Sequence, residues 1–176
     1  SLVLSERLGA TDLLLVGNMS AGEIYRTLGN YPKARTFLMR AVLLIDPERE
    51  QGHAGQVGLP AVRARSHLAW TLAELGDFPG ARMVADEAMR VADVSNHPYT
   101  VCHACLGLGG TRVRQGEFDA AIAVLARGCA TSENVPLLRP PIAADLGISY
   151  ARCGRIAEGL SHLDAAVEGA TKMGRF

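Results

Sequence analysis

The sequence predicts an all-α fold, a right-handed α-solenoid of about four helix-turn-helix repeats. Hydrophobic residues form 48% of the 176-residue chain while aromatic residues form only 5%, which favours closely packed helices rich in alanine and leucine. A short motif built around a glycine also occurs four times. Small residues recur at fixed distances from each of these glycines. Together these features predict stacked pairs of helices.

The four motifs mark the turn inside each helix pair. They read Leu28-Gly29-Asn30-Tyr31, Leu75-Gly76-Asp77-Phe78, Gln115-Gly116-Glu117-Phe118 and Cys153-Gly154-Arg155-Ile156. The glycine ends one helix in a left-handed conformation that other residues adopt only at a cost. The polar residue after it caps the next helix, a role that suits Asn30 and Asp77 and suits Arg155 poorly.

Small residues occupy three positions in each unit. Those five residues beyond the turn glycine are Ala34, Ala81, Ala121 and Gly159. Those twelve beyond it are Ala41, Ala88, Gly128 and Ala166, and those seven before it are Gly22, Ala69, Gly109 and Gly147. Small residues at these positions allow two antiparallel helices to approach closely, while larger residues fill the gaps between them.

From these signals we expect eight helices. Their approximate ranges are 12–29, 31–45, 60–75, 78–93, 98–115, 117–131, 140–153 and 155–172. The prolines at 60, 98, 140 and 141 stand where the first helix of a pair begins, a place where a missing backbone N–H costs nothing. The segment 46–59 contains one proline and three glycines, so we expect a loop there.

We interpret the chain as one domain, residues 1–176, that is part of a larger protein, because it begins at Ser1 and not at methionine. The repeats are expected over 11–46, 60–93, 98–131 and 140–172. Residues 1–9 are interpreted as the end of an upstream helix, and 46–59 as a loop inserted between the first two repeats.

The spacing of turn glycines and small residues resembles the tetratricopeptide repeat, a helix-turn-helix unit of about 34 residues. The likeness is strong in the first, second and fourth units and weaker in the third. Membership of this family implies a scaffold for protein binding, in which the first helix of each pair lines a concave groove. Some family members hold a partner's terminal carboxylate at set groove positions. Here those positions carry Met19, Ser66, Leu106 and Ala144, so that clamp is absent.

Several strings also resemble one particular setting of these repeats. They are Asp46-Pro47-Glu48, Leu59-Pro60-Ala61-Val62, Leu68-Ala69-Trp70, His97-Pro98-Tyr99 and Leu146-Gly147-Ile148-Ser149-Tyr150-Ala151. They are similar to the C-terminal repeat region of bacterial class III adenylate/guanylate cyclase-like proteins, in which an ATPase module precedes the repeats. Related repeats follow ATPase modules in bacterial transcription regulators. The resemblance implies a regulatory or assembly segment whose catalytic modules lie upstream.

Charge and hydropathy exclude two classes of partner. Lys and Arg number 18, as do Asp and Glu, so no charge excess exists to neutralise nucleic-acid phosphates. The richest apolar stretch, from Leu13 to Val16, is broken at once by Gly17 and Asn18, which is too short to span a membrane. We therefore expect neither nucleic acid nor membrane as a partner.

Cys102 and Cys105 form a Cys-x-x-Cys pair, which on a helix suits a metal or a redox pair. A structural zinc site needs two further ligands at comparable spacing, and the sequence has no second pair of this kind. We therefore interpret the four cysteines as reduced core thiols, with a metal site as the weaker alternative. Free thiols agree with a reducing cytoplasm, where we expect the protein.

We find no group of residues arranged as a catalytic site and no cofactor-binding motif in the sequence, and we expect no enzymatic activity in this chain.

Alignment of the four units identifies candidate groove residues on the first helices. They are Glu23, Arg26, Arg63, His67, Trp70, Glu74, His103, Arg114, Asp145 and Arg152. Trp and Arg are the residue types most enriched in binding hot spots. Trp70, the one tryptophan of the chain, has two interpretations: a partner contact, or a side chain packed against the next repeat.

The sequence therefore predicts a non-catalytic protein–protein interaction and regulatory scaffold. Its expected ligand is a protein or peptide, including upstream domains of the same chain, and it needs no cofactor. The alternative is a self-association element that dimerises a nucleotide cyclase-like or transcription-regulatory signalling protein.

Overall fold

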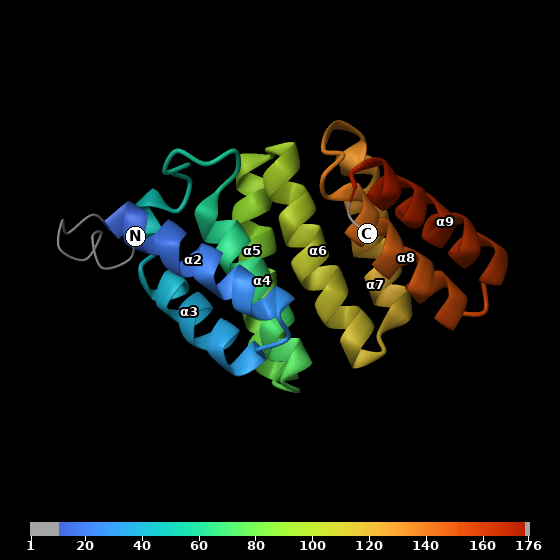
Figure 1. Cartoon of the computed structure of the whole chain (residues 1–176), viewed down its shortest axis with the longest axis horizontal. Helices are drawn as coiled ribbons and strands as arrows, with labels where there is room; N and C mark the ends of the chain where they lie inside the picture. The colour runs from blue at the N-terminus through green and yellow to red at the C-terminus, as the bar shows by residue number, and fades with distance from the viewer. Residues whose placement is uncertain (1–10, 175–176) are drawn as a thin grey trace.

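Eight α-helices follow one another through residues 11–174, the part of the chain that this computed structural model describes (Figure 1). They are α2 (Thr11–Thr27), α3 (Tyr31–Leu43), α4 (Pro60–Glu74), α5 (Phe78–Ser95), α6 (Pro98–Gln115), α7 (Phe118–Thr131), α8 (Arg139–Arg152) and α9 (Ile156–Lys172). Short 3-10 turns cover Pro47–Arg49 and Ser132–Asn134. The all-α prediction is confirmed, and each helix begins and ends close to its predicted bounds. The helix end expected at residues 1–9 lies outside the described residues.

The helices pack as four antiparallel pairs in a row, α2 with α3, α4 with α5, α6 with α7 and α8 with α9 (Figure 1). The first helices α2, α4, α6 and α8 also contact one another in sequence. Each second helix packs against the first helix of the following pair. The array is therefore one layer of first helices, whose outward surface we call the concave face, backed by a layer of second helices.

The turn inside each pair has the predicted chemistry. Gly29, Gly76, Gly116 and Gly154 have φ angles of 72°, 81°, 78° and 80°, the left-handed region that glycine enters without strain. The Asn30 side chain accepts a hydrogen bond from the backbone N–H of Lys33 at 3.2 Å. Asp77 accepts one from Gly80 at 3.1 Å, whereas the Arg155 side chain makes no such cap.

All twelve small residues that the repeat spacing identified are buried. Two backbones meet in the last pair, where a Cβ at Gly147 would lie 2.8 Å from the backbone oxygen of Gly159. A Cβ at Gly107 of α6 would lie 2.8 Å from the Cα of Ser66 in α4. Glycine is therefore used both within a pair and between neighbouring repeats to bring backbones together.

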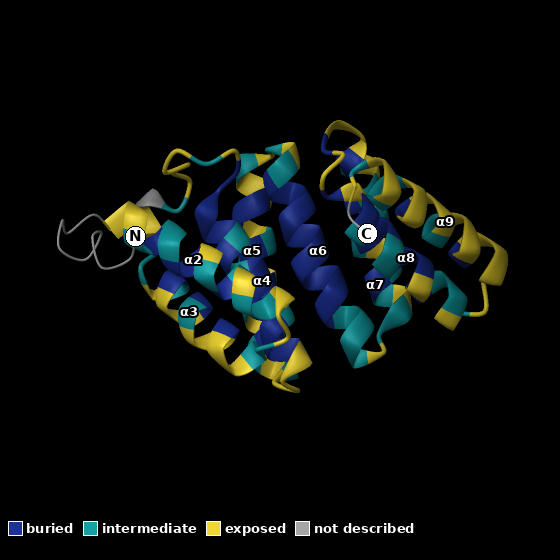
Figure 2. Ribbon diagram, viewed as in Figure 1, coloured by how far each residue is buried: buried dark blue, intermediate teal, exposed yellow. Residues whose placement is uncertain are grey.

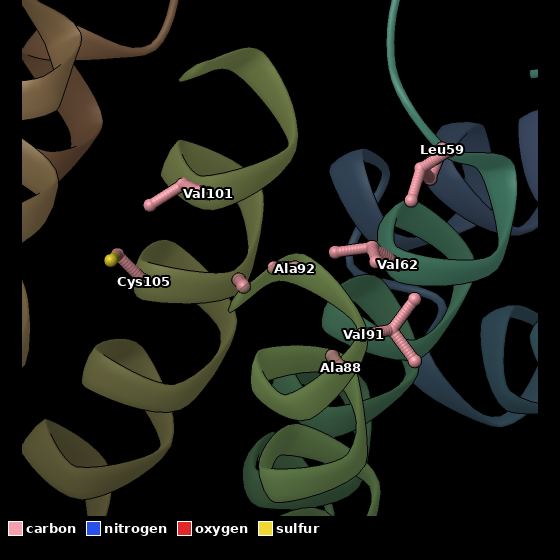
Figure 3. Packing of buried hydrophobic residues seen from close by; sticks show 8 residues of the cluster. Leu59, Val62, Ala88, Val91, Ala92, Val101 and Cys105 are labelled. Carbon is pink, nitrogen blue, oxygen red and sulfur yellow. The ribbon is translucent and has the colours of Figure 1, made fainter. Parts of the chain in front are cut away.

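The 46–59 loop is fixed to the helices beneath it. Leu59, at its end, belongs to the buried cluster that includes Val62 of α4, Val91 of α5 and Val101 of α6 (Figure 3). Its backbone N–H donates to the Thr100 hydroxyl at 3.2 Å. The loop thus joins the first repeat to the second and third through apolar packing as well as hydrogen bonds.

Replacing Gly147 by alanine is expected to lower the free energy of unfolding. The new methyl group meets backbone atoms of α9, which cannot move without the rest of that helix. The cost of this overpacking exceeds the gain in helix propensity from glycine to alanine, so the expected net loss is about 1–2 kcal/mol. Urea unfolding followed by circular dichroism measures the change.

Gly110→Ala is the matched control. A Cβ there would meet only the far ends of the Asp145 and Arg114 side chains, at 3.3 and 3.4 Å. This variant is expected to be as stable as the wild type or slightly more so. Equal stability of the two variants would contradict the close backbone approach.

Candidate functional site

The first helices bring nine of the ten candidate residues into one continuous group on the concave face. Two come from α2 (Glu23, Arg26), four from α4 (Arg63, His67, Trp70, Glu74), two from α6 (His103, Arg114) and one from α8 (Asp145). Arg152 lies apart from them, because its guanidinium carbon stands 5.1 Å from the ring centroid of Phe118 at the start of α7.

Trp70 lies at the centre of the group with an arginine from each neighbouring first helix against its ring. The guanidinium carbons of Arg26 and Arg114 lie 4.2 and 4.8 Å from the ring centroid. The indole Nε1 donates to the Glu74 carboxylate at 3.1 Å, and Arg114 Nε donates to the same oxygen at 2.6 Å. Trp70 is half-buried and also packs against the core between α6 and α8. Packing of Trp70 against the next repeat is thus observed, and its contact with a partner stays a prediction.

A second cluster forms around the Glu23 carboxylate. Arg63 donates to it at 2.5 Å, and His67 Nε2 lies 3.1 Å from its other oxygen. Burial raises the pKa of Glu23, but the contacts with His67 and Arg63 more than offset burial and lower the pKa to about 2. Glu23 is therefore ionised at neutral pH.

Two buried histidines continue this cluster into α6. The His103 ring lies 5.6 Å from that of His67 and 4.8 Å from that of Tyr99, measured between centroids. Burial lowers the pKa of His67, and burial together with the nearby positive groups lowers that of His103 well below its ordinary value. Both imidazoles are neutral at pH 7 and leave Glu23 as the acidic group of this cluster.

The two clusters border a pocket of about 300 Å³ on the concave face. Its polar lining residues are Glu23, Arg26, Arg63, His67 and His103, with the rings of Trp70 and Tyr99. The remaining lining residues are apolar: Leu106, Leu137, Leu138 and Pro141. We call this the concave pocket. A pocket lined by both charged and apolar groups fits a ligand that carries both characters.

Sequence reasoning missed Tyr99 and the apolar side of the concave pocket. Tyr99 follows the proline that begins α6 and lies one helical turn before His103, a spacing that places both on one face. Leu137 and Leu138 belong to the connection before α8, which the repeat alignment does not cover.

Asp145, the candidate residue of α8, has one buried carboxylate oxygen without a hydrogen bond among the described residues, and burial raises the pKa of this carboxyl group.

The Cys-x-x-Cys pair lies in the core and not on the concave face. Cys105 belongs to the buried cluster that includes Val62 and Val91, and Cys102 to the neighbouring cluster around Leu125 and Ile142. Burial raises the pKa of Cys102 to about 11 and that of Cys105 to about 12, so both are protonated thiols. Within residues 11–174, no three His, Cys, Asp or Glu side chains are arranged to hold a metal ion. None of the described helices is long and apolar enough to cross a lipid bilayer.

Comparison with protein families identifies the repeats. Residues 18–46, 62–92 and 140–165 match the tetratricopeptide repeat. These segments fall on the first, second and fourth helix pairs, the three that resemble the repeat most closely in sequence. The first, second and fourth helix pairs therefore match tetratricopeptide repeats.

Two solved structures share the fold. BtubC (BKLC) from P. vanneervenii is 18% identical with a TM-score of 0.67, and the match covers 94% of this chain and 66% of that chain. A Podosopora anserina protein with nearly identical TPR-like repeats, assigned as a kinesin light chain, is 15% identical with a TM-score of 0.59, and the match covers 92% and 77% of the two chains. No curated protein sequence matches the chain. At these identities the structures show the shared fold alone.

The free energy of unfolding is expected to fall as the pH is lowered from about 7 to about 5. Burial lowers the pKa of His67 and of His103 in the folded state, so each takes up its proton at a lower pH there than in the unfolded chain, where the pKa is near 6.5. The unfolded state then binds more protons and is favoured, by at most about 1.4 kcal/mol per pH unit for each histidine. Urea titrations at a series of pH values measure the slope.

His103→Gln is expected to reduce this slope, and His53→Gln, in the exposed part of the 46–59 loop, to leave it unchanged. Glu23 does not contribute in this range, because its lowered pKa matters only below its ordinary value of 4.5. A slope that His103→Gln leaves intact would contradict a buried neutral histidine.

Proposed function

We propose that this chain is a non-catalytic binding module that holds a protein partner, or another domain of a larger protein, on its concave face. Tetratricopeptide repeats generally mediate protein–protein interactions. The observation that carries the proposal is Trp70, half-buried between two arginines at the centre of that face.

The Trp70 group has the features of a binding hot spot. Trp and Arg contribute most to binding energy, and they do so in sites that are already well packed. Here Glu74 holds both the indole and Arg114 in place, so little side-chain freedom is left to lose when a partner binds. Glu23, Glu74, Arg26 and Arg114 add charges of both signs, which favours a polar partner surface over a purely apolar one.

Self-association is the second candidate, and α9 favours it. The side chains of Ile156, Leu160 and Val167 share one face of this helix and are each more than half exposed. α9 packs mainly against α8, which leaves that face available to a further helix. The residues therefore suit either a following repeat or a second copy of the chain.

The setting of the module rests on sequence resemblance. We infer a regulatory role in a bacterial nucleotide cyclase-like or transcription-regulatory signalling protein, in which upstream domains are the nearest partners. The free cysteines agree with a cytoplasmic location.

Trp70→Ala is expected to weaken partner binding by about tenfold or more, as hot-spot truncations do. The immobilised chain captures partners from an extract of the source organism, and the dissociation constant of a purified partner is then measured for wild type, Trp70→Ala and Arg114→Ala. Met83→Ala, an exposed apolar residue of α5 in the second layer, is the control and keeps wild-type affinity. Equal affinity of all four proteins would remove the concave face as the binding site.

If the chain self-associates through α9, light scattering at rising concentration will give a mass above that of the 18.7 kDa monomer. Leu160→Glu is expected to restore the monomer, because it places a charge in the apolar face. Leu43→Glu, at an even more exposed leucine at the end of α3, serves as control. A strictly monomeric wild type at high concentration would exclude this alternative.

A further inference from the structure

Three joints within the array share one pattern. A joint is the contact of a second helix with the first helix of the following pair, as between α3 and α4, α5 and α6, and α7 and α8. At each joint, the residue thirteen positions after the turn glycine packs against the buried cluster that contains the residue twelve positions before the next turn glycine. The three sets are Val42 with the cluster of Ala64, Met89 with that of Ala104, and Cys129 with that of Ile142. The position of a residue in its repeat therefore identifies the joint surface of each helix.

α9, at one end of the row, has the joint surface of a second helix (Figure 1). Val167 lies thirteen positions after its turn glycine and is 56% exposed. Leu160 lies at the repeat position of Ile122, which packs against the buried cluster shared by α6, α7 and α8, yet Leu160 is more than half exposed. These side chains form the apolar surface that a second helix inside the array buries against the next pair.

α2, in the pair at the other end, has the joint surface of a first helix. Ile24 lies five positions before its turn glycine and is 60% exposed. The other three first helices have residues of 0% exposure at that position, namely Thr71, Thr111 and Ser149. Leu13 shares the face of Ile24 and is more than half exposed, and Gly17 between them allows a neighbouring helix to approach closely. Repeat arrays normally end in polar faces, so two apolar joint surfaces indicate a further contact at the ends.

Charge favours a contact between these two ends. Inside the array, Arg127 of α7 donates to Asp93 of the preceding second helix, α5, at 2.6 Å. Arg40 of α3 occupies the repeat position of Arg127 and is exposed. All charged residues of α3 are basic, whereas α9 has three acidic residues and one lysine. A second copy whose α3 followed α9 would thus repeat the order of acid and base found between α5 and α7.

We infer that α9 of one copy of this chain docks on α2 of a second copy, so that the copies join end to end and the array continues across the junction. This inference rests on self-association, the second candidate of the proposed function, and names the surface that α9 meets. Because the two surfaces differ, each added copy leaves one α2 and one α9 uncovered, and the assembly grows without closing. Two α9 surfaces would pair into a closed dimer and bring acidic residues together.

Two variants each block one half of the junction. Leu160→Glu places a charge in the α9 surface and leaves α2 intact, and Ile24→Glu does the reverse. Light scattering at rising concentration gives the mass of each variant alone, of their equimolar mixture and of the wild type. Met83→Glu, at an exposed apolar residue of the interior helix α5, is the matched control, and circular dichroism verifies that every variant is folded.

We expect each blocking variant alone to stay a monomer of 18.7 kDa. The wild type and Met83→Glu are expected to pass twice that mass and continue to rise. The equimolar mixture is expected to reach twice the monomer mass and stop, because the intact α2 of Leu160→Glu binds the intact α9 of Ile24→Glu.

A mixture that stays monomeric overturns the inference, and so does an Ile24→Glu variant that assembles as the wild type does. A wild type that stops at a dimer also overturns it, and supports an α9–α9 pair, so self-association itself stands. A monomeric wild type overturns both. Partner capture on the concave face is measured separately, and Leu160→Glu is expected to retain it, so failure of the junction leaves the main proposal intact.

Discussion

The close approach of paired helix backbones determines the geometry of this molecule. At Gly147 and Gly159, and at Gly107 and Ser66, an added methyl group would meet the backbone of the neighbouring helix at about 2.8 Å. Few aromatic residues fit such an array, which explains their low content. The same tight spacing sets α2, α4 and α6 side by side, so that side chains from three helices reach one indole ring.

Electrostatics on the concave face follow from that spacing. Glu23 and Glu74 each hold an arginine from a neighbouring helix, and both pairs lie in the layer of first helices. Partly buried pairs of this kind add little net stability, because desolvation offsets much of their attraction. Their effect is mainly on position, because they hold Arg63 and Arg114 in one orientation.

Much of the fold could be predicted from the sequence because its determinants are local. A glycine with positive φ, an Asn or Asp cap and a proline in the first turn depend on a few neighbouring residues, and so does the position of a residue within its repeat. That position also brought nine candidate residues to one face.

The contacts between these residues could not be predicted, because the pairing of Glu23 with both Arg63 and His67 depends on distances between helices. Arg152 illustrates the limit: its repeat position favours the groove, but the nearby ring of Phe118 holds it elsewhere. Leu137 and Leu138 lie in a connection, where no repeat pattern applies.

The middle of the array and its last helix differ in how many of their residues are buried. Every residue of α6 from Thr100 to Thr111 is buried, and the helix is surrounded by α4, α5, α7 and α8 (Figure 2). In α9 only Gly159 and Ala166 are buried. In a linear array each repeat is stabilised by its neighbours alone, so opening spreads inward from the weakly covered end. Amide hydrogens of α6 will therefore exchange with solvent only when the whole array opens, whereas those of α9 exchange through local fraying. The described helix with the most glycines is in this sense the most protected part of the array.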